Sequence, residues 1–260
     1  MLPIATTVAM RHPPLVTWGL IGVNVFVFFF VQLPIARMGG EAALHAFLVQ
    51  WGLVPARYFV DGWAAAQGLD GNLLPFLTNT FLHGGLMHLA FNMWTLYIFG
   101  PAVEDRMGPL PYLLFYLACG VGASLAHALM NADSVLPAIG ASGAIAGISG
   151  AYVRLFPHSR IVIMVPVLFL PFFFELHALA FAAIWLGMQM ISGISALFMP
   201  PDVGGVAWWA HIGGFAVGWL MATHWLKRPR QRLLQPDEGK YGCCPDGRRN
   251  HAGPWGPRAG

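Results

Sequence analysis

Six long stretches of mostly apolar residues run along this 260-residue chain, separated by segments that hold most of the charged residues. An apolar stretch of about 20 residues is long enough to cross the hydrocarbon core of a bilayer as a helix. The pattern therefore predicts an all-α membrane protein with six membrane-spanning helices. We place these helices at residues 15–33, 84–101, 110–130, 141–156, 175–197 and 206–226.

Two segments between the predicted spans differ from the others. Residues 34–82 form a long first outer loop, whose tryptophans, glycines and polar residues predict short helices lying in the membrane interface. Residues 161–174 are apolar, but 14 residues are few for a span, and Pro166 and Pro171 disfavour a regular helix. We expect this second segment to be a loop that lies along the interface.

The composition is typical of a membrane protein, because only 10% of the residues are charged, against about 25% in soluble domains. We interpret residues 15–226 as one membrane domain. Residues 1–14 are expected to be a cytoplasmic N-terminal segment, and residues 227–260 a disordered tail rich in Pro, Gly and Arg. Basic residues cluster in this tail, where they act as topology signals. The expected partner is therefore the lipid bilayer and not a nucleic acid.

Charge also sets the predicted orientation. With a cytoplasmic N-terminus and six spans, the inner segments hold twelve of the fourteen Lys and Arg residues, and the outer segments hold only Arg37 and Arg57. Cytoplasmic segments near membrane spans carry an excess of Lys and Arg. Both termini are therefore expected to be cytoplasmic, in a bacterial inner (plasma) membrane.

This orientation places two polar residues near the outer ends of the fourth and sixth spans, namely Ser142 and His211. If residues 161–174 crossed the membrane as a seventh span, His211 would lie on the opposite side from Ser142. Six spans bring the two residues together, and seven separate them.

Ser142 lies between Gly140-Ala141 and Gly143 at the start of the fourth span. Alone, such a serine is most often a small residue that lets helices pack. Here Gly143 and Gly147 form a Gly-x-x-x-Gly pair that lets another helix approach closely. A helix N-terminus also exposes unpaired backbone N–H groups, which are natural donors to an oxyanion. Ser142 is therefore a candidate nucleophile.

His211 lies in the sixth span, in the segment Ala210-His211-Ile212-Gly213-Gly214. A histidine inside a membrane is a functional candidate by default, although a hydrogen bond to a neighbouring carbonyl is the structural alternative. His211, Gly214 and Gly218 share one helix face, so this helix and the fourth span are predicted to pack through glycines. A neutral imidazole placed beside Ser142 would accept its proton.

His88 and Asn92 are four residues apart and project from one face of the second span. Both side chains can donate hydrogen bonds, and each donor aimed at an oxyanion contributes about 3 kcal/mol to lowering the barrier. His83 is less specific, and a structural hydrogen bond explains it equally well. A metal held by His83 and His88 is a rival hypothesis, but they lie on different faces and no nearby carboxylate completes a site.

No other combination of residues indicates a cofactor or a metal. Cys243 and Cys244 are neighbours in the tail, and their spacing to His251 matches no common zinc pattern. No acidic residue accompanies His211 within its span, so the sequence predicts a Ser–His dyad. A water or a backbone carbonyl is left to orient the imidazole.

These motifs together resemble the rhomboid family of intramembrane serine proteases, over residues 74–226. The resemblance implies a six-helix bundle without a cofactor, which cleaves transmembrane protein substrates. It implies Ser142 as nucleophile, His211 as general base, and an oxyanion hole made by His88, Asn92 and the backbone N–H of Ser142. The matching segments are His83-Gly-Gly-Leu-Met-His88-Leu-Ala-Phe-Asn92, Gly100-Pro-Ala-Val-Glu104-Asp-Arg106-Met-Gly108, Gly140-Ala-Ser142-Gly143 and Ala210-His211-Ile-Gly-Gly214.

The same resemblance assigns supporting roles and shows two departures. Glu104 and Arg106 resemble a structural polar pair that stabilises the inner loop after the second span. Some relatives carry Trp-Arg in the first outer loop, where this chain has Leu74-Pro75. Some also stack a tyrosine on the histidine, at the position of Ala146 in this chain. Trp208 or Trp209 is a candidate to bury the histidine instead.

Two other functions compete with proteolysis. A catalytically inactive rhomboid relative would bind membrane helices as a binder or chaperone, but all four candidate site residues are present here. A small transporter or channel would carry charges or inverted repeats near the middle of the membrane. The spans of this chain are nearly free of charge, and no repeat is visible.

Overall fold

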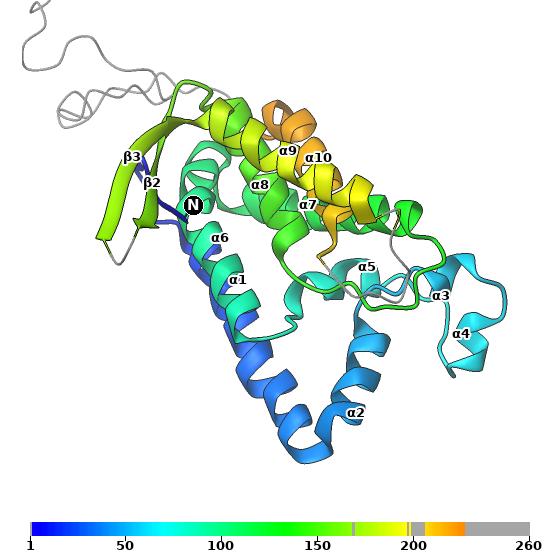
Figure 1. The fold of residues 1–260 in the computed structure, drawn as a ribbon. Coiled ribbons are helices and arrows are strands. Elements are labelled where there is room, and N and C mark those ends of the chain that lie inside the picture. The colour runs from blue at the N-terminus through cyan, green and yellow to red at the C-terminus, as the bar shows by residue number, and fades with distance from the viewer. Residues whose placement is uncertain (1, 168–169, 197, 199–205, 227–260) are drawn as a thin grey trace, which may run out of the picture.

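The computed structural model of the chain describes residues 2–167, 170–196, 198 and 206–226. Most of these residues are helical, and a small sheet lies at one side (Figure 1). The longer helices are α1 (Leu15–Phe26), α2 (Leu33–Trp51), α6 (Leu86–Met107), α7 (Pro109–Met130), α8 (Ser142–Leu155), α9 (Ala178–Ala196) and α10 (Trp208–Met221). The strands are β1 (Leu2–Thr6), β2 (Arg160–Val167) and β3 (Leu170–His177).

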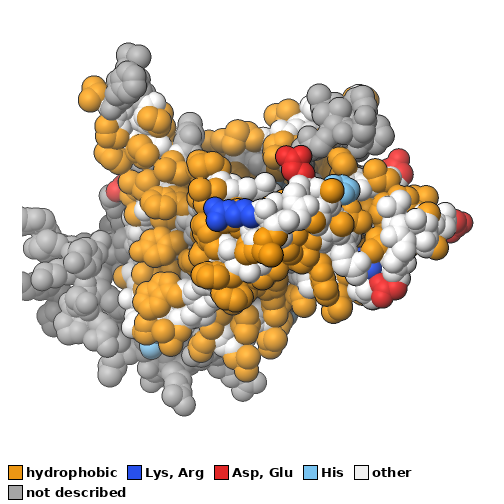
Figure 2. Space-filling view, turned by 90° about the horizontal axis from the view of Figure 1, so that it is seen from below, with side chains coloured by type: hydrophobic (Ala, Val, Ile, Leu, Met, Phe, Trp, Pro, Cys, Tyr) orange, Lys and Arg blue, Asp and Glu red, His pale blue; other side chains and the backbone are white. Residues whose placement is uncertain are grey.

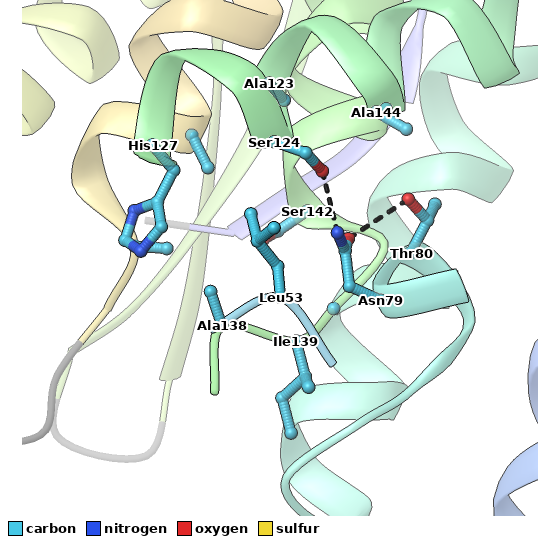
Figure 3. Close-up of a pocket in the computed structure, with 15 residues that line it drawn as sticks. Leu53, Asn79, Thr80, Ala123, Ser124, His127, Ala138, Ile139, Ser142 and Ala144 are labelled. Atoms are coloured by element: carbon cyan, nitrogen blue, oxygen red, sulfur yellow. Dashed lines mark hydrogen bonds between the residues drawn. The ribbon is translucent and has the colours of Figure 1, made fainter. Parts of the chain in front are cut away.

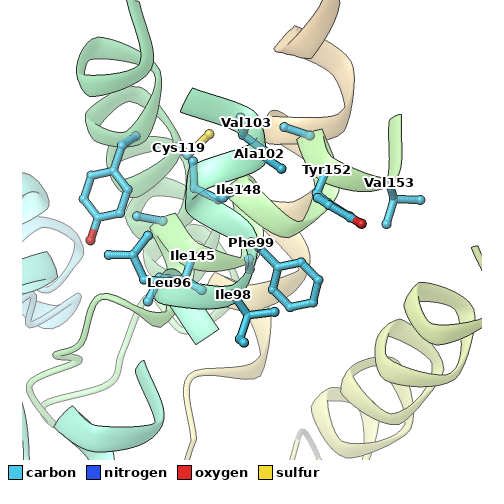
Figure 4. Close-up of a cluster of buried hydrophobic side chains, with 14 of the residues drawn as sticks. Leu96, Ile98, Phe99, Ala102, Val103, Cys119, Ile145, Ile148, Tyr152 and Val153 are labelled. Atoms are coloured by element: carbon cyan, nitrogen blue, oxygen red, sulfur yellow. The ribbon is translucent and has the colours of Figure 1, made fainter. Parts of the chain in front are cut away.

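Helix α8 lies at the centre of the molecule and packs against α6, α7, α9 and α10. Its side chains share one apolar core with α6 and α7, as Figure 4 shows for Phe99, Cys119 and Tyr152. The rings of Phe99 and Tyr152 meet edge to face, with their centroids 5.1 Å apart. Such a core fixes the axis of α8, and with it the position of the residue at its start.

Glycines let α8 and α10 approach until their backbones touch. A Cβ atom added to Gly214 would overlap the carbonyl oxygen of Gly143, and one added to Gly218 would overlap that of Gly147. A Cβ on Gly150 would in turn overlap the carbonyl oxygen of Phe215. The predicted packing of these two helices through glycines is confirmed, and it leaves no room for any larger residue.

The first predicted span is longer than residues 15–33. Helix α1 continues through a π-helical segment (Val27–Gln32) into α2, which ends at Trp51. Within α2 the backbone of Gly40 has φ +70°, and the chain turns back there toward α5 (Figure 1). The prediction that the outer loop starts at residue 34 is therefore wrong. The physical reason is that the chain stays helical as far as the Gly39-Gly40 pair, where the non-helical backbone of Gly40 separates two helices.

The outer loop proper contains the predicted short helices, with the bounds α3 (Ala56–Phe59), α4 (Trp63–Ala66), α5 (Pro75–Thr78) and the 3₁₀ turn η2 (Asn79–Phe81). Arg57 holds it together, because its buried guanidinium binds the carboxylate of Asp70 at 2.7 Å. Hydrogen bonds from Asn72 and Arg57 lower the pKa of the Asp70 carboxyl. The fold of the loop thus depends on one buried cation.

The all-α prediction is wrong in one region, because β1, β2 and β3 form an antiparallel sheet in that order. Of the segment 161–174, residues 161–167 lie in β2 and residues 170–174 in β3, so its described part is strand and not an interfacial loop. Pro166 and Pro171 face each other in its register. They exclude a helix, as expected, but β-branched and aromatic residues favour strands, and along the start of β2 buried residues alternate with partly exposed ones. Ile161 and Ile163 are the buried members of that alternation.

The sheet and the N-terminal segment lie against α6. The indole Nε1 of Trp94 donates to the carbonyl of Pro3 at 2.7 Å, and His12 contacts the Asp105 carboxylate at 2.7 Å. Residues 3–12 therefore run along α6 toward its C-terminal end. The fifth predicted span begins three residues later than residue 175, at Ala178, because β3 continues to His177.

Among the residues that the structure describes, three helical segments are long and apolar enough to cross a membrane: Leu15–Trp51, Pro109–Met130 and Ala178–Ala196. Helices α8 and α10 have 14 residues each and are short for a span. Hydrophobic side chains cover much of the described surface in Figure 2, and charged side chains are few on that part. The total of six spans stays a prediction, and the tail predicted for residues 227–260 lies outside the described residues.

The glycine contact predicts a stability difference between two otherwise similar substitutions. Gly218→Ala forces a methyl group into the Gly147 carbonyl, and we expect it to destabilise the protein by about 1–3 kcal/mol. Gly22→Ala in α1 is the control, because a Cβ there meets nothing within 4 Å. Thermal unfolding in detergent should show a lower midpoint for Gly218→Ala only. Equal midpoints for the two variants would contradict the packing.

Candidate active site

Ser142 is the first residue of α8, and the loop before it contains a backbone conformation that favours glycine. The residue two positions earlier, Gly140, has φ +129°, and its N–H donates to the carbonyl of Asn79 at 2.9 Å. L-residues rarely adopt this backbone conformation. The loop thereby delivers the serine, half-buried, to a helix N-terminus where backbone N–H groups lack partners within the helix.

Ser142 and His211 are in contact. The Ser142 Oγ lies 2.8 Å from the Nε2 of His211, although the two residues are 69 positions apart. Both come from the first turn of their helices, α8 and α10, and the glycine contact between these helices sets the distance. The structure thus brings the two side chains together, as predicted, at hydrogen-bond distance.

A third side chain, which sequence reasoning missed, completes this chain of hydrogen bonds. The Oε1 of Gln189 in α9 lies 2.7 Å from the Nδ1 of His211. With Nδ1–H donating to that oxygen, Nε2 is left unprotonated toward Ser142. A polar amide within an otherwise apolar helix was the available signal, since buried polar groups in membrane helices are costly.

Two tryptophans enclose the imidazole ring of His211. Trp185 lies one turn before Gln189 on α9, with ring centroids 5.9 Å apart and an interplanar angle of 34°. Trp208 meets the histidine edge-on, at 6.3 Å and 90°. The expectation that Trp208 helps to bury the histidine is confirmed, and Trp185 was missed. Trp209 packs instead near Gly193 of α9.

His88 and Asn92 lie on one face of α6, beside the loop that precedes Ser142. A Cβ added to Gly140 would lie 2.8 Å from the His88 ring and 3.5 Å from the Asn92 Nδ2. The Nδ2 of Asn92 is buried and has no hydrogen-bond partner among the residues that the structure describes. It is thus an unused donor close to the serine loop.

The ring of His83 packs against the ring of His88. The His83 ring is buried and meets the His88 ring edge-on at 5.2 Å. Its backbone is held on both sides by Gln32, whose amide accepts from the His83 N–H and donates to the His83 carbonyl, each at 2.9 Å. Within the described part of the chain, no three His, Cys, Asp or Glu residues are arranged to hold a metal ion.

Glu104 and Arg106 have separate partners instead of acting as one pair. The Glu104 carboxylate accepts from the backbone N–H groups of Val16 and Thr17 at 2.9 and 2.8 Å, and from the Thr17 hydroxyl at 2.7 Å. It therefore caps the N-terminus of α1, where a negative charge is favourable. The Arg106 guanidinium lies over the ring of Phe156, 5.9 Å from its centroid.

Ser142 borders two cavities. The larger, of about 330 Å³, is mainly apolar and is lined by Ser142, His211 and Asn92, together with residues of α9 and β1. The smaller, of about 20 Å³, has room for about one water. Figure 3 shows Asn79, Ser124 and His127 around this smaller cavity, and the amide of Asn79 donates to the Ser124 hydroxyl at 2.7 Å.

Comparison with known proteins gives a consistent result. Residues 70–228 match the family model described as "Rhomboid domain", which is more than half of the chain. The chain belongs to the rhomboid family. It is a multi-pass membrane protein, and its family is one of intramembrane proteases.

Three rhomboid relatives illustrate the similarity. The chain is 31% identical to RHOMBOID-like protein 4 of Arabidopsis thaliana over 168 residues, which are 63% of this chain and 36% of that protein. It is 27% identical to Rhomboid protein 1, mitochondrial, of Saccharomyces cerevisiae over 231 residues, 86% of this chain and 58% of the relative. It is 36% identical to Rhomboid protease GluP of Bacillus subtilis over 144 residues, 55% of this chain and 25% of the relative.

The chain thus spans less than two thirds of the length of each of these rhomboid proteins. Some relatives are named as mitochondrial, so a bacterial inner membrane stays a prediction for this rhomboid. Some rhomboids have a tyrosine that stacks on the histidine at the position of Ala146, and alanine has no ring. Trp185 of α9 supplies a ring instead.

The position of Gly140 predicts a loss of function without a loss of fold. In Gly140→Ala, a methyl group would meet the His88 ring in a strained backbone. We expect the rate of any serine-dependent reaction to fall by about 10-fold or more. Gly85→Ala is the control, because its backbone is extended and a Cβ there meets nothing within 4 Å. Equal rates for both variants, measured on correctly folded protein, would contradict this geometry.

Proposed function

We propose that this rhomboid is an intramembrane serine endopeptidase that cleaves transmembrane segments of other membrane proteins. The observation that carries the proposal is the 2.8 Å contact between the Ser142 Oγ and the His211 Nε2. A serine and a histidine in this arrangement are the nucleophile and base of covalent acyl transfer. The apolar cavity that both residues line suits a lipid-embedded peptide segment that has locally unwound.

In the first step, the Ser142 Oγ attacks the carbonyl carbon of the substrate peptide bond. The hydroxyl proton passes to the Nε2 of His211, and the carbonyl oxygen takes the negative charge. The tetrahedral intermediate then collapses, the C–N bond breaks, and His211 gives the proton to the leaving amine. An acyl-enzyme ester on Ser142 remains.

The negative charge on the tetrahedral intermediate needs hydrogen-bond donors that are in place before the reaction. We assign this role to the side chains of His88 and Asn92 and to the backbone N–H of Ser142. The buried Nδ2 of Asn92, which has no partner among the described residues, supports the assignment, because a donor kept free in the resting site is available to a substrate oxygen.

Hydrolysis of the acyl-enzyme consumes one water molecule. We place that water in the cavity of about 20 Å³ beside Ser142, where Asn79, Ser124 and His127 provide polar surroundings. His211 takes a proton from the water as it attacks the ester carbon. The serine oxygen leaves, receives the proton back, and the acid product is released.

An inactive rhomboid that only binds membrane helices is the competing function. It would need no hydrogen bond between Ser142 and His211, nor an amide behind the histidine. A cleavage assay separates the two functions. A transporter is the weaker alternative, because the helix interiors of this chain carry almost no charge.

Loss of either dyad residue should abolish cleavage. Ser142→Ala and His211→Ala are each expected to reduce cleavage of a model transmembrane substrate in proteoliposomes to below about one thousandth of the wild-type rate. His45→Ala is the control, because this exposed histidine lies in α2, remote in sequence from the site. Equal cleavage by the wild type and both dyad variants would end the proposal.

The proposed oxyanion donors should affect the rate and not the binding of substrate. Asn92→Ala and His88→Ala are each expected to lower kcat by about 100-fold with little change in KM, because the donors act on charge that develops during the reaction. Steady-state kinetics with the same substrate measure both constants. A rise in KM at constant kcat would assign these residues to substrate binding.

A further inference from the structure

Gln189 is a buried amide on a helix that is otherwise apolar on its inner face. The four buried residues of α9 form one stripe along it, and the other three are small: Ala178, Ala182 and Gly193. Only Gln189 sends a long polar side chain inward from this stripe, and its side chain is buried. Burying an amide without a partner is costly, so its contact with His211 needs an explanation.

We propose that Gln189 is a positioning residue that keeps His211 in the tautomer with its proton on Nδ1. This inference rests on the proposed function. A neutral imidazole carries one N–H, and the other nitrogen accepts. The Gln189 Oε1, 2.7 Å from Nδ1, accepts that N–H, which leaves the Nε2 lone pair directed at the Ser142 hydroxyl. With the proton on Nε2, His211 would be unable to take the serine proton.

An uncharged amide suits this apolar site better than a carboxylate would. The amide oxygen accepts a hydrogen bond but carries no charge, so it adds no unpaired anion to an apolar helix. It fills the place that an acidic residue has in triads. The dyad predicted from sequence is therefore, in the proposed mechanism, a triad whose third member is uncharged.

The same helix supplies the ring that packs on the imidazole. Trp185 and Gln189 are four residues apart, so they project from neighbouring positions on one face of α9. The Trp185 ring lies beside the His211 ring at an interplanar angle of 34°, and the Gln189 Oε1 lies 2.7 Å from its Nδ1. The placement of α9 therefore sets both the tilt and the tautomer of the histidine.

Substitutions at Gln189 test this role. Gln189→Met keeps the length and removes the acceptor, and Gln189→Glu keeps an acceptor and adds charge. Ser195→Ala is the control, because it removes an exposed hydrogen bond of α9 to the Ile191 carbonyl. We expect Gln189→Met to lower kcat by about 10- to 100-fold at nearly constant KM, and Ser195→Ala to match the wild type.

The pH profile distinguishes positioning from general damage to the fold. Among the described residues, the titratable groups that act electrostatically on His211 are His88 of α6 and His127 of α7, and neither is a carboxylate. A glutamate at position 189 would stabilise the imidazolium, so we expect the acid limb of the profile of Gln189→Glu to move to higher pH. Wild-type kcat and an unmoved profile in both Gln189 variants would overturn the inference.

A spectroscopic measurement keeps the inference separate from the proposed function. The measurement is ¹⁵N NMR of protein with labelled histidine, in which the signals of His211 are assigned by their loss in His211→Ala. We expect a protonated Nδ1 and a bare Nε2 at pH 8 in the wild type, and a shift toward the other tautomer in Gln189→Met. Protonated Nε2 in the wild type, or no change in the variant, would overturn the role of Gln189 even if the protein cleaves its substrate. Absence of cleavage with the expected tautomers would instead remove only the proposed function.

Discussion

Helices α8 and α10 touch backbone to backbone, and the candidate site exists only because they do. The carbonyl oxygens of Gly143 and Gly147 occupy the space where Gly214 and Gly218 would carry a Cβ. Inside a membrane, helix association gains little from the hydrophobic effect, so close packing must provide the stability. At any wider spacing, the Ser142 Oγ and the His211 Nε2 would lose the hydrogen bond at 2.8 Å.

The other helices hold groups in place around that contact. Helix α6 presents His88 and Asn92 to the loop at Gly140, and His83 packs behind them. Helix α9 presents Gln189 and Trp185 to the far side of the imidazole. Each group is thus fixed by a separate rigid element, which is how a preorganised site avoids rearrangement during the reaction. The buried Glu104 carboxylate contributes at a distance, because it fixes the start of α1 against the end of α6.

The sequence was most informative where a residue type is unusual for its surroundings. A histidine in an apolar span and glycines at a spacing of four led to Ser142, His211 and their helix contact. The sheet was not predicted, because Pro166 and Pro171 exclude a helix without indicating a strand, although Ile161 and Ile163 in the same segment alternate with more exposed residues as in a strand. Gln189 was missed for a different reason. A neutral amide has no characteristic spacing to a histidine 22 residues away, and only tertiary packing joins them.

The most direct test is to locate the nucleophile chemically. A fluorophosphonate reacts with an activated serine, and mass spectrometry of the digested protein identifies the modified residue. A serine activated by the neighbouring imidazole predicts one adduct, on Ser142, in the wild type and its loss in His211→Ala, while Ser195→Ala labels as the wild type does. An adduct on another residue, or equal labelling of Ser142 without His211, would contradict the assignment of these two residues as nucleophile and base.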